Sequence, residues 1–411
     1  MEGVWRREAA RVIARLSRLT RDVGLAEELA QDALVAALET WPQTGVPVNP
    51  GAWLVTTGKN RALDRLRKRK LVARKHEALG AEMMAPDPSP ADEAMDDFIG
   101  DDLLRLVFQA CHPVLSLDAQ VARTLRKLGG LTTDQIASAF LAPSPTIAQR
   151  IVRAKRRLSE AQVAFELPRG EELWGRTQAV LRVIYLVFNE GHAATAGDAL
   201  VRKDLCEQAK HLGRMMLSLL PREPEVYGLV ALMEIQGSRF AAREDGDGRP
   251  VLLLDQDRGS WDQEAIARGL GALCRAHLLG GRGPYVLQAE IAACHARARR
   301  AEDTDWARIA ARYAELARLM PSPVVELNRA LAVSMAEGPA AGLAIVDRLR
   351  GEPALADWHR LPAARAEMLL RLGRVDEAIV ELERAAEGAT HPREREQLLE
   401  RAARCREGAM T

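Results

Sequence analysis

The side chains most able to do chemistry in this 411-residue chain are bases and amides that recur at helical spacing. One set falls in a predicted helix that follows a turn at residues 142–145. It comprises Thr146, Gln149, Arg150, Arg153, Lys155 and Arg156. Guanidinium groups can bond guanine edges and a glutamine amide can bond adenine, while further cations hold phosphates. With a helix predicted at 131–141, the pattern favours a helix-turn-helix that enters the major groove over a merely solvated face.

A second basic set lies in a helix predicted from about residue 52 to residue 75. Its members are Asn60, Arg61, Asp64, Arg65, Arg67 and Lys68. Mixed amide, carboxylate and guanidinium groups suit the base edges of separated strands, and the basic run suits the backbone. Trp53 serves either as core or as a stacking platform. An intrahelical pair between Asp64 and Lys68 is the plainer alternative for that carboxylate.

A third set is acidic and amphipathic, and it precedes both basic helices. It consists of Glu27, Glu28, Gln31 and Asp32. Repulsion keeps such a face away from DNA, so it suits a protein partner; a plain solvated face is the alternative.

The elements that must position these sets are helices. Apolar residues make up 47% of the chain and aromatic residues only 4%, which favours an all-α fold. The net charge of +1 hides nine bases against one acid over residues 59–75, and nine acids with no base over residues 77–102. We expect four parts, at residues 1–76, 77–102 (an acidic linker with three prolines), 103–165 (the helix-turn-helix) and 170–411.

The long C-terminal part contains a weak internal repeat. Residues 344–346 recur as 378–380, an offset of 34, and each triplet follows a turn at Gly338 or Gly373. Such a period is typical of tetratricopeptide-like helical hairpins.

Several classes of function are excluded by what the sequence lacks. It has no glycine-rich phosphate loop, no G-x-S-x-G and no H-E-x-x-H, so we do not expect an enzyme. The five cysteines are dispersed and the adjacent pairs Cys111-His112 and Cys294-His295 suit packing, so we expect no metal, no cofactor and a reducing cytoplasmic setting. No apolar run is long enough to predict a membrane span.

In this order, the acidic face, the first basic helix and the helix-turn-helix resemble the extracytoplasmic-function sigma factors of bacterial RNA polymerase. The resemblance covers residues 5–160. It is carried by the acidic stretch before Trp41-Pro42, by the run from Trp53-Leu54 through Asn60 and Asp64 to Arg67-Lys68, and by the helix-turn-helix. Gly58 stands where the family commonly has Ala, for which we expect only a small loss of helix propensity.

The resemblance implies the partners and the role of each set. The acidic face would dock on the clamp helices of the largest polymerase subunit, with the flap as a further contact. The first basic helix would recognise and open the minus-ten element, and the second would read minus thirty-five. A stand-alone helix-turn-helix regulator with a helical sensor domain is the alternative, although it leaves residues 20–75 unexplained.

The C-terminal part resembles the subgroup of these factors that carries a long tetratricopeptide-like extension. The resemblance implies a regulatory task, with a regulatory protein or a ligand as partner. A polar and aromatic set there suits either an internal or inter-domain site, or helix caps and buried pairs. Its members are Asn189, Glu190, Asp255, Asp257, Arg258 and Trp261.

Overall fold

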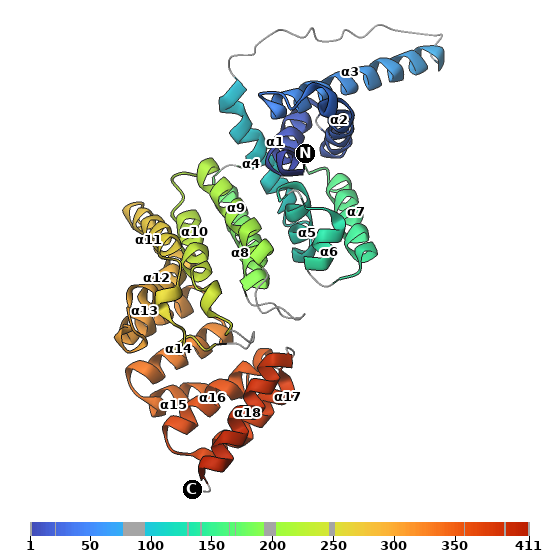
Figure 1. The fold of residues 1–411 in the computed structure, drawn as a ribbon. Coiled ribbons are helices and arrows are strands. Elements are labelled where there is room, and N and C mark those ends of the chain that lie inside the picture. The colour runs from blue at the N-terminus through green and yellow to red at the C-terminus, as the bar shows by residue number, and fades with distance from the viewer. Residues whose placement is uncertain are drawn as a thin grey trace. The chain divides into compact units, whose positions relative to one another are not determined.

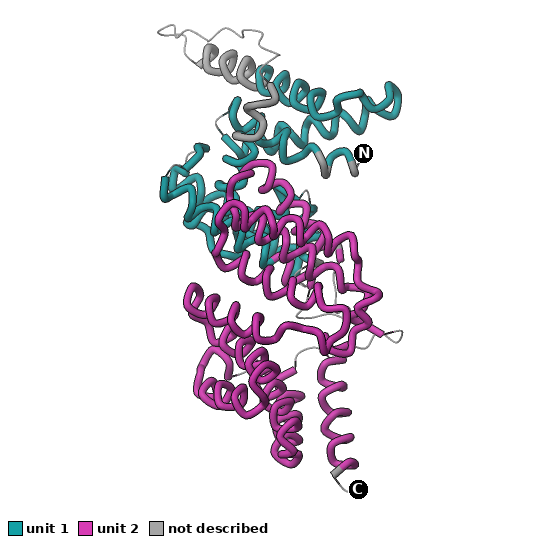
Figure 2. Tube along the Cα trace, turned by 90° about the vertical axis from the view of Figure 1, so that its left-hand side faces the viewer, with its two compact units in different colours: residues 1–186 teal, residues 187–411 magenta. Residues whose placement is uncertain are grey.

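The described part of the chain is built from 18 α-helices and four short 3-10 helices, without a strand (Figure 1). The computed structural model describes residues 2–20, 22–76, 95–129, 131–139, 142–163, 165–168, 170–192, 203–245, 251–356, 358–389 and 392–409. The all-α prediction is confirmed. None of the helices in these ranges is long and apolar enough to cross a membrane. The chain divides into two compact units, Met1–Leu186 and Val187–Thr411 (Figure 2).

Unit 1 begins with three mutually packed helices, α1 (Glu2–Thr20), α2 (Val23–Thr44) and α3 (Pro50–His76). Asp22 caps α2 as predicted, because its carboxylate accepts hydrogen bonds from the backbone N–H groups of Gly24 (2.8 Å) and Leu25 (3.1 Å). The core between the helices contains the fully buried side chains of Leu16, Leu29 and Leu54.

Gly58 has a packing role in this core, so the expectation of a propensity effect alone was wrong. A Cβ atom added at Gly58 would lie 2.7 Å from Cδ1 of Leu16. Glycine therefore allows α3 to approach α1 closely, and an alanine would require Leu16 to move.

Four further helices of unit 1 carry the helix-turn-helix. They are α4 (Met95–Ala110), α5 (Leu117–Lys127), α6 (Thr133–Ala139) and α7 (Ser144–Glu160). Thr132 and Gln135 form a reciprocal capping box at the start of α6, with N···O distances of 2.8 and 3.1 Å. The hydroxyl of Ser144 donates to Asp134 (2.6 Å) and so ties the turn to α6. Of the predicted linker, residues 77–94 lie outside the described residues and residues 95–102 are helical.

Unit 2 is a succession of helical hairpins. Consecutive helices pack on one another from α9 to α18, and α10 also packs on α12. Helix α8 (Glu171–His192) contributes its last six residues to this unit. The other helices are α9 (Lys203–Leu219), α10 (Pro224–Gly237), α11 (Gln263–Leu278), α12 (Pro284–Arg297), α13 (Trp306–Leu319), α14 (Pro323–Ala336), α15 (Pro339–Leu349), α16 (Arg360–Arg371), α17 (Val375–Gly388) and α18 (Pro392–Ala409).

The predicted repeat corresponds to equivalent helices of this succession. Residues 344–346 lie in α15 and residues 378–380 lie in α17, and the turns before them place Gly338 and Gly373 at φ values of +106° and +73°. Glycine adopts this left-handed region without steric cost, which lets each hairpin turn sharply. The helical-hairpin prediction for the C-terminal part is confirmed.

Candidate nucleic-acid and polymerase interface

Helix α3 presents the first predicted DNA-binding set. Asn60 and Asp64 are exposed, whereas Arg61 is half-buried and lies 3.8 Å from a carboxylate oxygen of Asp32 on α2. Arg65, Arg67 and Lys68 follow on the same helix, where the backbone is described but the side chains are not. The structure thus joins one member of the minus-ten set to one member of the acidic set.

Trp53, at the start of α3, packs on a second indole. Its ring lies 5.3 Å from that of Trp41, edge to face, and Trp41 is buried. Aromatic pairs in this geometry stabilise a core. The contact favours the core interpretation of Trp53 over the stacking platform.

Helix α7 separates an apolar face from a basic one. Ile147, Ala154 and Leu158 are buried. The members of the predicted minus-thirty-five set that are exposed are Thr146, Gln149, Arg153, Lys155 and Arg156. A basic helix anchored by its opposite face has the form needed to enter a major groove.

Arg150 and Arg156 of α7 are engaged in ion pairs, the first with another element of unit 1 and the second within the helix. The half-buried Arg150 lies 3.2 Å from Asp118 of α5. Arg156 pairs with Glu160 one turn later on the same helix (2.6 Å). Pairs at such exposed sites contribute little stability and can be exchanged for phosphate contacts.

The acidic face of α2 meets lysines from the helix-turn-helix part. Glu27 forms an ion pair with Lys127 at the end of α5, and Glu28 lies 3.8 Å from Nζ of Lys155 on α7. Gln31 is exposed and Asp32 is half-buried. The residues predicted to bind polymerase and a residue predicted to bind DNA therefore contact each other.

Lys127 is the functional residue that sequence reasoning missed. It is only 4% exposed, and burial together with the nearby Arg123 lowers its pKa to about 8, while Glu27 opposes this shift. Arg123 is also buried and its pKa is lowered by burial, again against the influence of Glu27. A quarter-exposed carboxylate on α2 thus stabilises two cations of α5. The only hint in the sequence is a basic last turn of a short amphipathic helix.

A second electrostatic contact joins α4 to α1. Asp102 is 1% exposed and lies 2.7 Å from Arg105, 3.7 Å from Arg15 and 3.8 Å from Arg18. Burial raises the pKa of Asp102, and the three arginines oppose the rise. The two halves of unit 1 are therefore held by buried charges as well as by apolar packing.

The C-terminal polar set is only partly brought together. Asp257 accepts a hydrogen bond from the backbone of Gly259 (2.9 Å), and the buried Arg258 lies over the ring of Trp261 at 5.3 Å. Asp255 is exposed, and Asn189 and Glu190 lie near the end of α8, with Asn189 exposed and Glu190 half-buried. Of the six residues, the structure thus brings Arg258 and Trp261 into direct contact.

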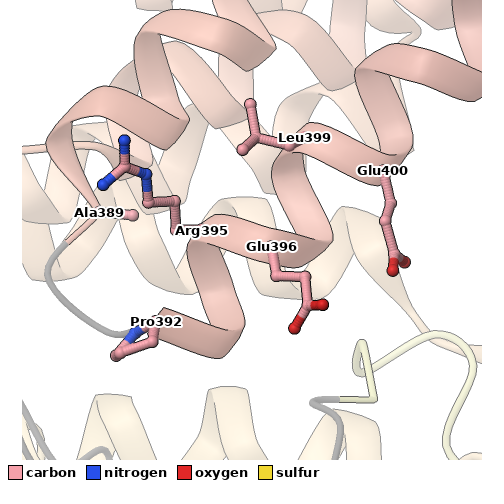
Figure 3. Close-up of a pocket in the computed structure, with 6 residues that line it drawn as sticks. All are labelled: Ala389, Pro392, Arg395, Glu396, Leu399 and Glu400. Carbon is pink, nitrogen blue, oxygen red and sulfur yellow. The ribbon is translucent and has the colours of Figure 1, made fainter.

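In the described ranges no group of three metal-ligating side chains comes together. Cys111 is buried 3.3 Å from Oγ1 of Thr124, and burial raises the pKa of its thiol to about 12. A shallow hollow of about 430 Å³ lies beside α18, lined by Ala389, Pro392, Arg395, Glu396, Leu399 and Glu400 (Figure 3). Its mixed charges point to no particular ligand.

Known proteins resemble both parts of the chain. Residues 4–72 match the family Sigma-70 region 2, and residues 176–277 match a family of unknown function (DUF6596). An uncharacterized protein of Rhizobium meliloti (strain 1021) is 43% identical over 384 residues, which is 92% of this chain and 89% of that protein.

Sigma factors are found among the relatives of the N-terminal part. The ECF RNA polymerase sigma factor SigK of Mycolicibacterium vanbaalenii is 30% identical over 158 residues, which is 36% of this chain and 76% of that protein. The protein of the same name from Mycobacterium sp. (strain KMS) is 31% identical over 156 residues, with the same coverage. Among solved structures, yeast Tom70 covers 99% of this chain at 12% identity and a TM-score of 0.38, too low to support an argument. Because its N-terminal third aligns with most of SigK and matches Sigma-70 region 2, the chain belongs to the extracytoplasmic-function family of RNA polymerase sigma factors.

Proposed function

We propose that the chain binds core RNA polymerase through the acidic face of α2 and directs it to promoters with two DNA-reading helices, and that residues 170–411 modulate this activity. The observation that carries the proposal is the presence, in one unit, of an acidic face and two basic helices whose polar faces reach solvent. A stand-alone duplex-binding regulator would need only α6 and α7.

The two DNA-reading helices divide the work by chemistry. The exposed Asn60 and Asp64 of α3 combine donor and acceptor groups, which suits unpaired base edges of a minus-ten element. On α7, Gln149 and Arg153 suit base edges of a paired minus-thirty-five element, and Lys155 and Arg156 suit phosphates.

The described arrangement of unit 1 corresponds to a resting form in this proposal. In this form Glu27 and Glu28 pair with Lys127 and Lys155, so polymerase competes with these lysines for the same carboxylates. Binding to the clamp helices therefore exchanges one set of cationic partners for another, and it frees Lys155 for DNA. In this proposal the number of ion pairs stays the same during the exchange, so we expect only a small change in electrostatic free energy.

The test is run-off transcription with core polymerase on a pool of genomic fragments. The full chain should select start sites that core polymerase alone does not use. Glu28→Gln should reduce both polymerase retention and transcription, while Glu39→Gln, an exposed carboxylate on the same helix, should leave both unchanged. Equal activity of the two variants would contradict docking through this face.

Template opening separates the two DNA contacts. A promoter with a pre-opened minus-ten region should restore transcription to an Asn60→Ala, Asp64→Ala double variant, because its defect lies in melting. The same template should not restore transcription to Arg153→Ala, whose defect lies in duplex binding. Tight duplex binding by the full chain without polymerase would instead favour the stand-alone regulator.

The modulating role of residues 170–411 is tested on the same promoter. We expect a chain that ends after residue 165 to differ strongly in activity from the full chain. Equal activity would remove the extension from initiation.

A further inference from the structure

Unit 2 contains a group of cationic and imidazole side chains that plays no part in the proposed DNA or polymerase contacts. We call it the arginine–histidine cluster: His192, Arg239, Arg243, Arg258 and His295. They come from the end of α8, from the residues that follow α10, from the 3-10 helix at 258–260 and from the end of α12. The backbone N–H of Asp262 donates to the carbonyl oxygen of Ser238 (2.8 Å), which places the segment of Arg239 beside the one that carries Arg258. Burial, Arg243 and Arg258 each lower the pKa of Arg239.

Arg239 is the least compensated cation of the cluster. It is half-buried, and its one recorded hydrogen bond is donated by Nη2 to the amide oxygen of Gln236 (2.6 Å). Within the described ranges no carboxylate forms an ion pair with it, and burial with the two arginines lowers its pKa to about 10. A buried guanidinium without an anion is costly, which is why proteins usually supply one.

His192 adds a buried donor beside the arginines. Nη1 of Arg243 lies 2.8 Å from Nδ1 of His192, and Arg243 also donates to the carbonyl oxygen of that residue. Because a guanidinium can only donate, Nδ1 accepts, and the proton of the neutral ring is on Nε2. Nε2 is buried and has no hydrogen-bond partner of good geometry among the described residues. Burial, together with Arg243 and Arg239, lowers the pKa of the ring well below its usual value, and Gln236 opposes this shift.

The far side of the cluster has further unused polar atoms. Arg258 donates to the carbonyl oxygens of His295 (2.8 Å) and Ala298 (3.0 Å) and, through Nη2, to Oγ1 of Thr304 (3.0 Å), and so binds the end of α12. In the part of unit 2 that is described, its Nε, Nδ1 of His295 and Nε1 of Trp261 are buried without a partner. Buried nitrogen atoms of Arg258, His295 and Trp261 therefore lack a hydrogen-bond partner among the described residues.

We propose that the arginine–histidine cluster binds a small ligand bearing a phosphate group, either free phosphate or a phosphate monoester. Glu244 and Glu394 offset Arg243, and Asp303 and Glu302 offset Arg258, but no described carboxylate offsets Arg239. A dianion with several acceptor oxygens matches both the uncompensated charge and the unused donors. Guanidinium groups bind phosphate oxygens bidentately, which adds geometric selectivity.

The experiment measures binding to the full chain without polymerase or DNA, so its outcome is independent of the proposed promoter function. Calorimetry and thermal melting are recorded with inorganic phosphate and with phosphoserine, at constant ionic strength set by sodium chloride. We expect saturable binding and a rise in Tm. Arg239→Gln should weaken binding by about tenfold or more, as loss of a charge-assisted contact does. Arg275→Gln, an exposed arginine of α11, should not.

Two further measurements guard against a misfolded variant. In phosphate-free buffer Arg239→Gln should melt no lower than the unsubstituted chain, since it removes an uncompensated charge. The imidazole NMR signals of His192 and His295 should shift on phosphate addition in the unsubstituted chain and not in the variant. Tighter binding of phosphoserine than of phosphate would identify a phosphorylated small molecule as ligand, and the reverse would identify phosphate itself. Absence of saturable binding, or equal binding by Arg239→Gln, would overturn the proposal.

Discussion

The two units of the molecule treat buried cations differently. In unit 1, Lys127 lies in the interface between the helix-turn-helix and α2, and it meets the carboxylate of Glu27. In unit 2, Arg239 lies among other cations and meets no carboxylate in the described ranges. The charge of Lys127 is compensated by a carboxylate of the same chain. The charge of Arg239 has no such partner in the described ranges, and in our proposal a bound anion supplies it.

This difference is not a general property of unit 2. Arg365, on α16, is more deeply buried than Arg239, yet it donates to Asp347 (2.8 Å) and to the buried Glu381 (3.0 Å). The helical hairpins can therefore compensate a buried arginine fully where the charge serves only the fold. The absence of a described carboxylate beside Arg239 is therefore the observation on which the phosphate proposal rests.

The largest effect is expected from removing the anion of the unit 1 pair. Glu27→Gln leaves Lys127 buried without its carboxylate partner. It should lower the free energy of unfolding of unit 1 in its resting form by about 3–5 kcal/mol. Lys127→Met keeps the packing and should cost far less, because the remaining Glu27 is a quarter exposed and can be hydrated. The double variant should recover most of the loss. Chemical denaturation measures the three values, and a double variant no better than Glu27→Gln would show that the pair is not the cause.

The same substitution at two arginines of unit 2 should have opposite consequences. Arg365→Gln leaves Glu381 buried and unpaired and should lower the free energy of unfolding by about 2–4 kcal/mol. This loss is smaller than for a pair whose members are all buried, because the other partner, Asp347, is accessible to water. Arg239→Gln should leave stability unchanged or raise it in buffer free of multivalent anions. Melting curves of both variants test this prediction. A large drop in the melting temperature of Arg239→Gln would mean that Arg239 already pairs with an anionic group of the chain.

The two units should respond to pH in separate windows. The folded-state pKa of Lys127 is about 8 instead of 10.5, so the unfolded chain binds more protons between these values and stability rises with pH there. The pKa of His295 is lowered from 6.5 to about 4 by burial and by Arg239 and Arg258, so stability is lost as pH falls from 6.5 towards 4.

These windows are assigned by comparison with variants. The difference in stability between the unsubstituted chain and Lys127→Met should change only in the alkaline window. The difference in stability between the unsubstituted chain and His295→Gln should change only in the acidic window. Bound phosphate should make the loss of stability in this window smaller, because an anion favours the protonated imidazole. A flat difference in either window would contradict the environment described for that residue.

The smallest effect is expected at an ion pair on the surface. Arg156 and Glu160 are both largely exposed, although their N···O distance is only 2.6 Å. Water and salt screen such pairs, so Glu160→Gln should leave the melting temperature within experimental error. A clear shift in melting temperature would mean that the N···O distance, rather than burial, determines how much stability is lost when an ion pair is broken.

Local features of this fold could be predicted from the sequence with good accuracy. The cap at Asp22, the start of the helix-turn-helix near Thr132 and the buried face of α7 at Ile147, Ala154 and Leu158 all depend on residues within one or two turns. Caps and helix faces are set by local hydrogen bonding and by the helical period. The hairpin turns at Gly338 and Gly373 belong to the same class.

Contacts between distant residues could not be predicted in this way. Gly58 fits against Leu16 and Lys127 against Glu27, and neither pair follows from a local pattern. Arg239 belongs to a set whose members are spread from residue 192 to residue 295, and its interpretation depends on which carboxylates the fold places near it in the described ranges. The roles of the DNA-facing residues rest on their chemistry and on the family to which the chain belongs.

The pair between Glu27 and Lys127 makes the availability of the polymerase-docking surface a matter of populations. Every tenfold excess of covered over uncovered molecules subtracts about 1.4 kcal/mol from the apparent affinity for polymerase, without altering a single contact in the final complex. A change confined to α5 could therefore set how strongly this factor competes for a limited pool of polymerase. Competitiveness and promoter choice would then evolve as independent traits.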